Sequence, residues 1–136
     1  MLKKILCVDD DPITLMLCKK VIERTSFAQE IITAQNGEEA IQYFKKIITE
    51  IKKGNDVDYP KLVLLDLNMP VMNGWEFLNT YLENKFQDIL TSKFIVLSST
   101  IDPDDVNKSK KYKMVIDFMS KPITTEMLET LKNRNL

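Results

Sequence analysis

The sequence predicts an α/β fold: a doubly wound, five-stranded parallel sheet with strand order 2-1-3-4-5 and helices on both faces. Along its 136 residues, short apolar runs alternate with longer segments of helical period, a pattern typical of parallel sheets. Two runs, Ile5–Val8 and Leu62–Leu65, are continuously apolar, as strands buried on both faces require. Both runs end directly in carboxylates, at Asp9 and at Asp66. This pattern indicates one shared acidic site at the carboxyl edge of the sheet.

Five strands follow from the apolar runs. Right-handed crossovers between successive strand–helix units give the doubly wound order, in which the first and third strands are neighbours where the winding reverses. The expected strands are Lys4–Val8, Ile31–Ala34, Leu62–Asp66, Phe94–Leu97 and Val115–Met119. Ligands bind outside the carboxyl ends of the strands at such a reversal, which is where the carboxylates fall.

The first two helices have recognisable starts. Asp11-Pro12 combines an N-cap acid with a first-turn proline, and the helix runs to about Arg24. Asn36 can cap the second helix, with Glu39 three residues later to complete a capping-box-like pair. This second helix ends near residue 53. Its apolar stripe at helical spacing is formed by Ala40, Ile41, Phe44, Ile47, Ile48 and Ile51.

Three further helices complete the units. The third starts at about Gly74, and a fourth, short and polar, follows the cap-plus-proline pair Asp102-Pro103. The fifth starts after Pro122. The side chains expected to face the core are Phe77, Leu78, Tyr81 and Leu82 in the third helix and Met127, Leu128 and Leu131 in the fifth.

Length and composition restrict the class of protein. We expect a single domain over residues 1–136, with 44% hydrophobic and 29% charged residues as in ordinary globular proteins. The net charge of -1 gives no attraction to nucleic acid or to anionic membranes, so neither is an expected partner. The apolar stretch at the start of the sequence is too short for a signal peptide, and no apolar run has the length of a membrane span. A cytoplasmic protein is therefore expected.

Two residue counts limit the chemistry. There is no histidine, which excludes histidine-based catalysis and most transition-metal sites. Cys7 and Cys18 lie on an apolar strand and a helix, and without an export signal both are expected to be reduced thiols.

The carboxylates at the two strand ends need a cation or retained protons. Three carboxylates about 5 Å apart repel one another by roughly 3 kcal/mol per pair at an effective dielectric near 20. Oxygen ligands alone favour a hard divalent ion, and Mg²⁺ is the cofactor expected among them. A magnesium site open on one side suits phosphoryl transfer, and Asp66 can be the nucleophile because carboxylates form acyl phosphates.

Two later motifs supply further groups to the same edge of the sheet. Ser98-Ser99-Thr100 follows the fourth strand with hydroxyl donors, and Lys121-Pro122 follows the fifth strand with an ammonium. Carboxylate, hydroxyl and ammonium groups therefore converge from neighbouring strands.

These motifs resemble the signatures of the response-regulator receiver domain, of the CheY-like superfamily, in two-component signal transduction. The resemblance covers the whole chain and all four motifs in order. They are Val8-Asp9-Asp10-Asp11-Pro12, the stretch from Leu65 to Gly74, Val96-Leu97-Ser98-Ser99 and Ser120-Lys121-Pro122. The long central stretch, combined with Lys-Pro after the last strand, makes the resemblance specific.

The resemblance implies a role for each matched residue. Asp66 would accept the phosphoryl group, and Lys121 would pair with the phosphoryl oxygens. Asp9 or Asp10, together with Asp66 and the backbone carbonyl of Asn68, would hold Mg²⁺, leaving Asp11 mainly as the helix cap. Ser98 would move to bind the phosphate, and Phe118 occupies the aromatic switch position. This pair would rearrange the face formed by the fourth helix, fifth strand and fifth helix.

The resemblance also implies partners. The phosphoryl donor would be a phosphohistidine of a sensor histidine kinase or of a histidine phosphotransfer protein. The protein would be a signalling phosphoacceptor, and an enzyme only in catalysing its own phosphorylation and dephosphorylation. We expect a stand-alone receiver without an output domain, acting on an unknown downstream target protein, and a phosphorylation-dependent homodimer is compatible with this reading.

Other readings of the same residues stay open. A metal-dependent phosphohydrolase would also form an aspartyl phosphate, but it usually needs a second acid two residues beyond the nucleophile, where this chain has Asn68. A pseudo-receiver would bind partners without phosphorylation. A lysine cluster in and after the fourth helix is a solvated face or a docking surface for an acidic partner; it comprises Lys108, Lys110, Lys111 and Lys113. Nucleic acid is the weakest third hypothesis for it, because the cluster has no interleaved aromatic residues or arginines.

Overall fold

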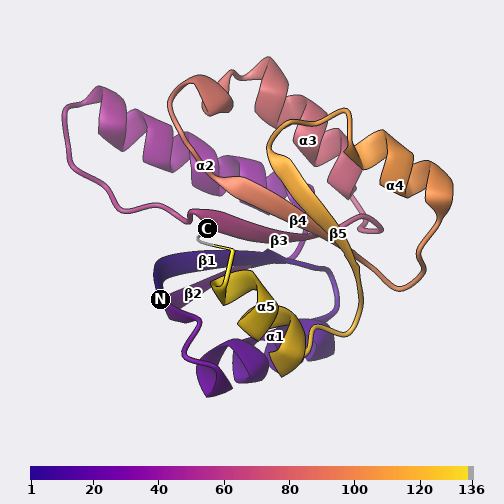
Figure 1. The fold of residues 1–136 in the computed structure, drawn as a ribbon. Helices are drawn as coiled ribbons and strands as arrows, with labels where there is room; N and C mark the ends of the chain where they lie inside the picture. Colours follow the sequence, from indigo (N-terminus) through magenta and orange to yellow (C-terminus); the bar gives the residue numbers. More distant parts are fainter. Residues whose placement is uncertain (135–136) are drawn as a thin grey trace.

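A computed structural model describes residues 1–134 and confirms the predicted sheet and its order (Figure 1). All neighbouring strands are parallel, in the order β2-β1-β3-β4-β5. The strands are β1 Leu2–Val8, β2 Ala28–Ala34, β3 Leu62–Asp66, β4 Lys93–Ser98 and β5 Val115–Ser120. The helices are α1 Pro12–Arg24, α2 Gly37–Lys52, α3 Gly74–Glu83, α4 Pro103–Ser109 and α5 Thr125–Lys132, with a short 3₁₀ helix, η1, at Phe86–Asp88.

The helices form a layer on each face of the sheet. Helices α1 and α5 cover one face, while α2, α3 and α4 cover the other (Figure 1). The core beneath α2 and α3 is rich in aromatic rings, and Phe44 lies at its centre, fully buried, with ring centroids 5.3 to 6.4 Å from four buried rings. Those four rings belong to Phe77, Tyr81, Phe86 and Phe94. The core beneath α1 and α5 is aliphatic, apart from Phe27 and the two cysteines.

The edge strands differ most from the expected boundaries. Strand β2 begins at Ala28, three residues before the predicted start, because its exposed Gln29 and Glu30 interrupt the apolar run without ending the ladder. On the other edge, β5 carries an irregularity opposite Phe94 and Ile95, where one additional residue enters the strand. All residues of β5 up to Met119 are half-buried, so this edge strand contributes no fully buried residue to the core.

The predicted N-caps are confirmed, with one correction. Asp11 and Asp102 each accept a hydrogen bond from a backbone N–H two residues later, at 2.9 Å. Asn36 accepts from the N–H of Glu39, also at 2.9 Å. The reciprocal half of the expected capping box is wrong: the Glu39 carboxylate accepts instead from the N–H of Gln35, at 3.1 Å.

The predicted start of α5 after Pro122 is confirmed: the helix begins at Thr125, capped by Thr124. Two further details were not predicted correctly. Leu82 and Met127 are half-buried rather than core residues, because they lie at the borders of their apolar stripes. The complete capping box of the protein, Asn73 with Glu76, was not expected and fixes the start of α3.

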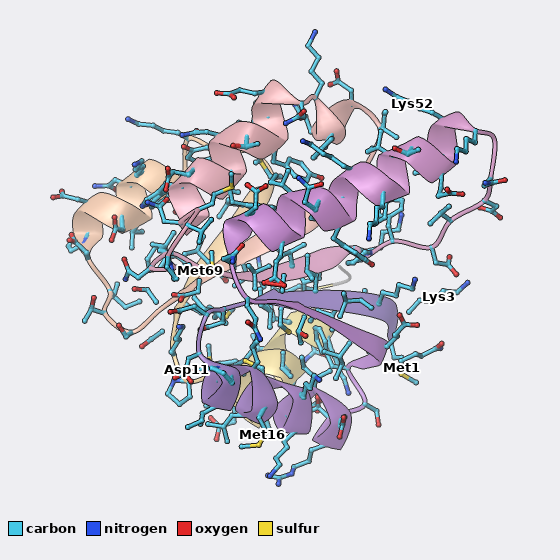
Figure 2. All side chains as sticks on the ribbon, turned by 180° about the vertical axis from the view of Figure 1, so that it is seen from behind. Met1, Lys3, Asp11, Met16, Lys52 and Met69 are labelled. Carbon is cyan, nitrogen blue, oxygen red and sulfur yellow. The ribbon has the colours of Figure 1, made fainter. Side chains whose placement is uncertain are left out.

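The two ends of the sheet are chemically distinct. Figure 2 shows Asp11 and Met69 at the end where the strands terminate, and Met1, Lys3 and Lys52 at the opposite end. The loops that follow β1, β3, β4 and β5 therefore meet at one edge, as parallel strands require. None of the helices within residues 1–134 combines the length and the apolar character that crossing a membrane needs.

Phe44 offers a test of the aromatic core. Replacing it in the variant Phe44→Ala should lower the free energy of unfolding by about 3–5 kcal/mol, because a fully buried ring leaves a cavity that its neighbours cannot fill. The adjacent Tyr43 is half-buried, so Tyr43→Ala should cost clearly less. Urea denaturation of both variants measures the difference, and equal losses would contradict the central position of Phe44.

Candidate functional site

Asp66 ends the central strand β3 and is almost fully buried, with 4% of its surface exposed. One of its carboxylate oxygens, Oδ1, accepts a long hydrogen bond from the N–H of Asn68, at 3.4 Å. The start of α3 packs directly behind it. A Cβ atom on Gly74 would lie 2.6 Å from the Asp66 carbonyl oxygen, so only glycine permits this close approach of helix and strand.

Asp9 and Asp10 reach the same place from the end of β1. Asp9 is buried, and its Oδ1 accepts from the N–H of Asp11 at 2.9 Å, while Asp10 is exposed. Oxygen atoms of Asp9, Asp10 and Asp66 all lie within 4.8 Å of one another. The three carboxylates that the sequence assigned to one site are thus together, and their spacing fits a divalent ion with oxygen ligands.

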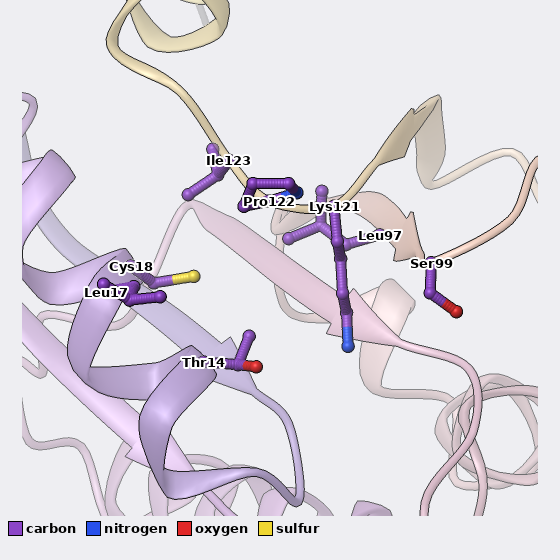
Figure 3. Close-up of a pocket in the computed structure, with 8 residues that line it drawn as sticks. All are labelled: Thr14, Leu17, Cys18, Leu97, Ser99, Lys121, Pro122 and Ile123. Atoms are coloured by element: carbon purple, nitrogen blue, oxygen red, sulfur yellow. The ribbon is translucent and has the colours of Figure 1, made fainter.

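Lys121 joins the two buried acids. Its Nζ lies 2.6 Å from Oδ2 of Asp9 and 3.1 Å from Oδ1 of Asp66. Its backbone N–H donates to the carbonyl of Ser98 at 2.8 Å, which ties the ends of β4 and β5 together and aims the side chain. Figure 3 shows the lysine extending from the loop after β5 toward the carboxyl ends of the strands.

The charges of these groups determine one another's ionisation. Burial raises the pKa of Asp66, and the neighbouring charge of Asp9 raises it further, while the ammonium of Lys121 acts in the opposite direction. For Lys121, burial by itself lowers the pKa, but the hydrogen bond to Asp9 and the two carboxylate charges outweigh it, so the net pKa is raised. The side chain of Lys121 is therefore protonated, and its positive charge offsets the negative charges of Asp9 and Asp66.

The two residues expected to act as a switch lie on the same side of the acid cluster. Ser98, at the end of β4, is 2% exposed, and its Oγ accepts from the N–H of Thr100 at 3.4 Å. Phe118 is half-buried on β5, opposite Val96. It lines a cavity of about 190 Å³ with Val106 and Ser109 of α4. Space for side-chain movement thus exists between α4 and β5.

A second cavity, of about 220 Å³, lies between α1 and the loop after β5 (Figure 3). Its walls are mainly apolar, formed by Leu17, Leu97 and Ile123, and Lys121 borders it. Cys18 also faces this cavity, and burial raises the pKa of its thiol to about 11. The thiol is therefore protonated, and Cys7 and Cys18 are both free, in agreement with the expected reduced state.

Sequence reasoning missed the backbone features that shape the edge of the site. The N–H of Met72 donates to the carbonyl of Pro70 at 2.8 Å, closing a tight turn around Val71. Val71 adopts a φ of 69°, which is unusual for a β-branched residue, and its side chain is 79% exposed. Gly37, at the start of α2, donates to the carbonyl of Met72 at 3.0 Å and holds this turn in place.

A doubly wound sheet whose carboxyl edge carries three carboxylates and a lysine defines the CheY-like class of proteins. Comparison with known families makes this specific: the response regulator receiver domain matches residues 5–132, so the chain belongs to that family. The prediction of the family is confirmed.

Individual relatives agree with this assignment. A two-component response regulator from Cytophaga hutchinsonii superposes with a TM-score of 0.85 at 28% identity, covering 98% of this chain and 96% of that one. The chemotaxis protein CheY4 of Vibrio cholerae shares the fold, with a TM-score of 0.76 at 22% identity and full coverage of both chains. Among curated proteins, a probable methanogenesis regulatory protein, FilR2, of Methanothrix harundinacea is 26% identical over 125 residues, which are 92% of this chain and 76% of the relative.

Longer relatives match over part of their length. The nitrate/nitrite response regulator NarL of Escherichia coli is 33% identical over 102 residues, covering 75% of this chain and 40% of NarL. Two probable transcriptional regulators, ycf27, are matched over 25% of their length. Receiver domains of this family thus occur within larger regulators.

The raised pKa of Asp66 gives a pH-dependent prediction. In the metal-free protein, the contribution of Asp66 to stability is fully present below its ordinary pKa of 3.8 and is lost as the pH rises through the higher folded-state pKa. The variant Asp66→Asn has no carboxylate at this position and does not show this loss of stability with rising pH. Its melting temperature relative to the parent protein should therefore increase between about pH 4 and pH 7.

Thermal melts in chelator-containing buffers measure this difference. Asp56→Asn, in the exposed loop before β3, is the matched control and should give a constant difference across the range. A parallel, pH-independent offset for both variants would show that burial of the Asp66 carboxylate does not destabilise the fold.

Proposed function

We propose that this receiver accepts a phosphoryl group on Asp66 from the phosphohistidine of a sensor histidine kinase or of a histidine phosphotransfer protein. The observation that carries the proposal is the Lys121 ammonium, which lies within 3.1 Å of both Asp9 and Asp66 at the carboxyl edge of the sheet. A half-buried lysine shared by two acids is suited to neutralise an incoming phosphoryl group beside the nucleophile.

The two oxygens of Asp66 have different surroundings. Oδ1 accepts from Asn68 and pairs with Lys121, whereas Oδ2 has no hydrogen-bond partner within residues 1–134. We assign Oδ2 as the attacking oxygen. It forms a bond to phosphorus while the bond from phosphorus to the donor imidazole nitrogen breaks, and that nitrogen keeps the electron pair. Lys121 then donates to a phosphoryl oxygen.

The carboxylates of Asp9, Asp10 and Asp66 fit a Mg²⁺ ion, with the Asn68 carbonyl as the further protein ligand we assign. Their oxygens lie within 4.8 Å of one another, and within residues 1–134 this group contains carboxylates and no cysteine. When bound, Mg²⁺ would neutralise the charge on the phosphoryl oxygens during transfer. The exposed position of Asp10 leaves one side of the site open to a donor.

We assign the response to Ser98 and Phe118. A phosphoryl group on Asp66 adds acceptor oxygens close to the buried Ser98 hydroxyl, which now makes only one long hydrogen bond. Movement of Ser98 would free space for Phe118 to turn inward from the cavity that it lines. The changed face of α4, β5 and α5 would then bind a downstream target protein or a second copy of the chain.

Phosphorylation of Asp66 is tested directly with a small-molecule phosphodonor and Mg²⁺. We expect one phosphate per chain by mass spectrometry, and none in Asp66→Asn, because this variant lacks the carboxylate oxygen that we assign as the attacking atom. Asp56→Asn serves as the control and should be labelled like the parent protein. Full labelling of Asp66→Asn would refute the assignment, and rapid multiple turnover on phosphate monoesters would instead support a phosphohydrolase.

Mg²⁺ binding is tested by stability. A tenfold excess of Mg²⁺ over its dissociation constant should add about 1.4 kcal/mol to the free energy of unfolding, because the ion binds only the folded chain. Asp10→Asn should lose most of this gain, whereas Asp11→Asn should keep it, since Asn caps a helix as well as Asp does. Identical unfolding curves with and without Mg²⁺ would favour a pseudo-receiver.

A further inference from the structure

A basic groove lies between α3, α4 and the starts of β4 and β5, on a side of the molecule that the proposed phosphoryl transfer does not use. It consists of two adjoining hollows of about 540 and 580 Å³, which share Leu82, Lys111 and Tyr112. Helices α3 and α4, which form its walls, are neighbours on the same face of the sheet (Figure 1). The groove is therefore large enough to receive a peptide segment.

The rim of the groove carries uncompensated positive charge. Lys93, Lys108, Lys111 and Lys113 line it and are exposed, and Asp104 is the acid that lines it. Four lysines against one aspartate leave a local charge of +3 on a chain whose net charge is -1. Within residues 1–134, none of these four lysines forms a salt bridge. Their charges are thus available to a partner.

The floor of the groove is apolar. Leu90 is buried at its base, while Leu82, Met114 and Ile116 are half-buried and present apolar surface to solvent. A solvated lysine face needs no such floor. The combination of an apolar floor and a basic rim is complementary to a segment with apolar side chains on one side and carboxylates on the other.

Tyr112 holds the groove in a defined shape. Its ring stacks on Trp75 of α3 with centroids 5.8 Å apart, and its hydroxyl donates to Oδ1 of Asn79 at 2.7 Å. Lys108 packs over the Trp75 ring, with its Nζ 4.5 Å from the ring centroid. A preformed groove loses little conformational freedom when it binds, which favours binding.

We infer that the basic groove docks an acidic amphipathic segment of a partner protein. Nucleic acid fits less well, because the rim has no arginine and its one aromatic ring, Tyr112, is already stacked on Trp75. The apolar floor would also stay unused by a phosphate backbone. The inference goes beyond the proposed function and needs no phosphorylation, so it is tested on the unphosphorylated chain.

The probe is a synthetic helical peptide with glutamates on one face and leucines on the other. Trp75, the single tryptophan of the chain, reports binding because it stacks on the groove residue Tyr112. We expect saturable binding at low salt, weakened about tenfold or more in the double variant Lys111→Glu/Lys113→Glu, through loss of charge complementarity. The control Lys19→Glu/Lys20→Glu makes the same charge change on α1, across the sheet, and should bind like the parent.

Two competitors complete the experiment. A scrambled peptide of identical composition should bind clearly more weakly, because it cannot place its leucines on the floor while its glutamates face the rim. Equal binding of both peptides, or equal weakening by both double variants, would overturn the inference. Tighter binding of a single-stranded oligonucleotide, lost in the Lys111/Lys113 variant, would assign the groove to nucleic acid instead. If that variant melts early, Lys93→Gln/Lys113→Gln replaces it with a smaller change.

Discussion

The ammonium of Lys121 between the carboxylates of Asp9 and Asp66 is the interaction on which the site depends. Two buried acids at the ends of adjacent strands would repel each other and face the cost of lost hydration. A single half-buried lysine offsets both effects, with its Nζ 2.6 Å from Asp9 and 3.1 Å from Asp66. The sheet order makes this geometry available, because β1 and β3 are neighbours and a long side chain from the end of β5 reaches across β4.

Backbone contacts, rather than side chains, hold the frame of the site. The carbonyl of Ser98 fixes Lys121, and the N–H of Gly37 fixes the turn at Met72. Gly74 permits α3 to begin in direct contact with the strand that ends in Asp66. The turn from Pro70 to Met72 keeps Val71 at a positive φ with an exposed apolar side chain. This conformation costs stability, so the turn needs support from the residues around it.

The sequence was sufficient for the sheet order, the buried central strands and the convergence of Asp9, Asp10, Asp66 and Lys121, because apolar runs and strand-end charges are local signals. It was insufficient where the deciding contact is tertiary. The edge strand β2 pairs through exposed polar residues, and Glu39 reaches Gln35 because of the path of the preceding turn. Three lysines of the basic groove belong to the lysine cluster seen in the sequence, but Lys93 comes from β4. The apolar floor joins α3, the loop before β4 and the start of β5, which no local pattern connects.

The distribution of packing indicates which part of the molecule can respond. Strands β3 and β4 are almost entirely buried and α2 buries an apolar stripe, whereas β5 is half-buried and α4 has only seven residues, with a cavity between them. Elements with little buried apolar surface open at the lowest free energy. The loosely packed segment, α4 with β5, thus lies between the two sites. Ser98 and Lys121 connect it to the acidic site, and Lys111 and Tyr112 connect it to the basic groove. A change at Asp66 that shifts α4 would alter the stack of Tyr112 on Trp75, and with it the shape of the groove.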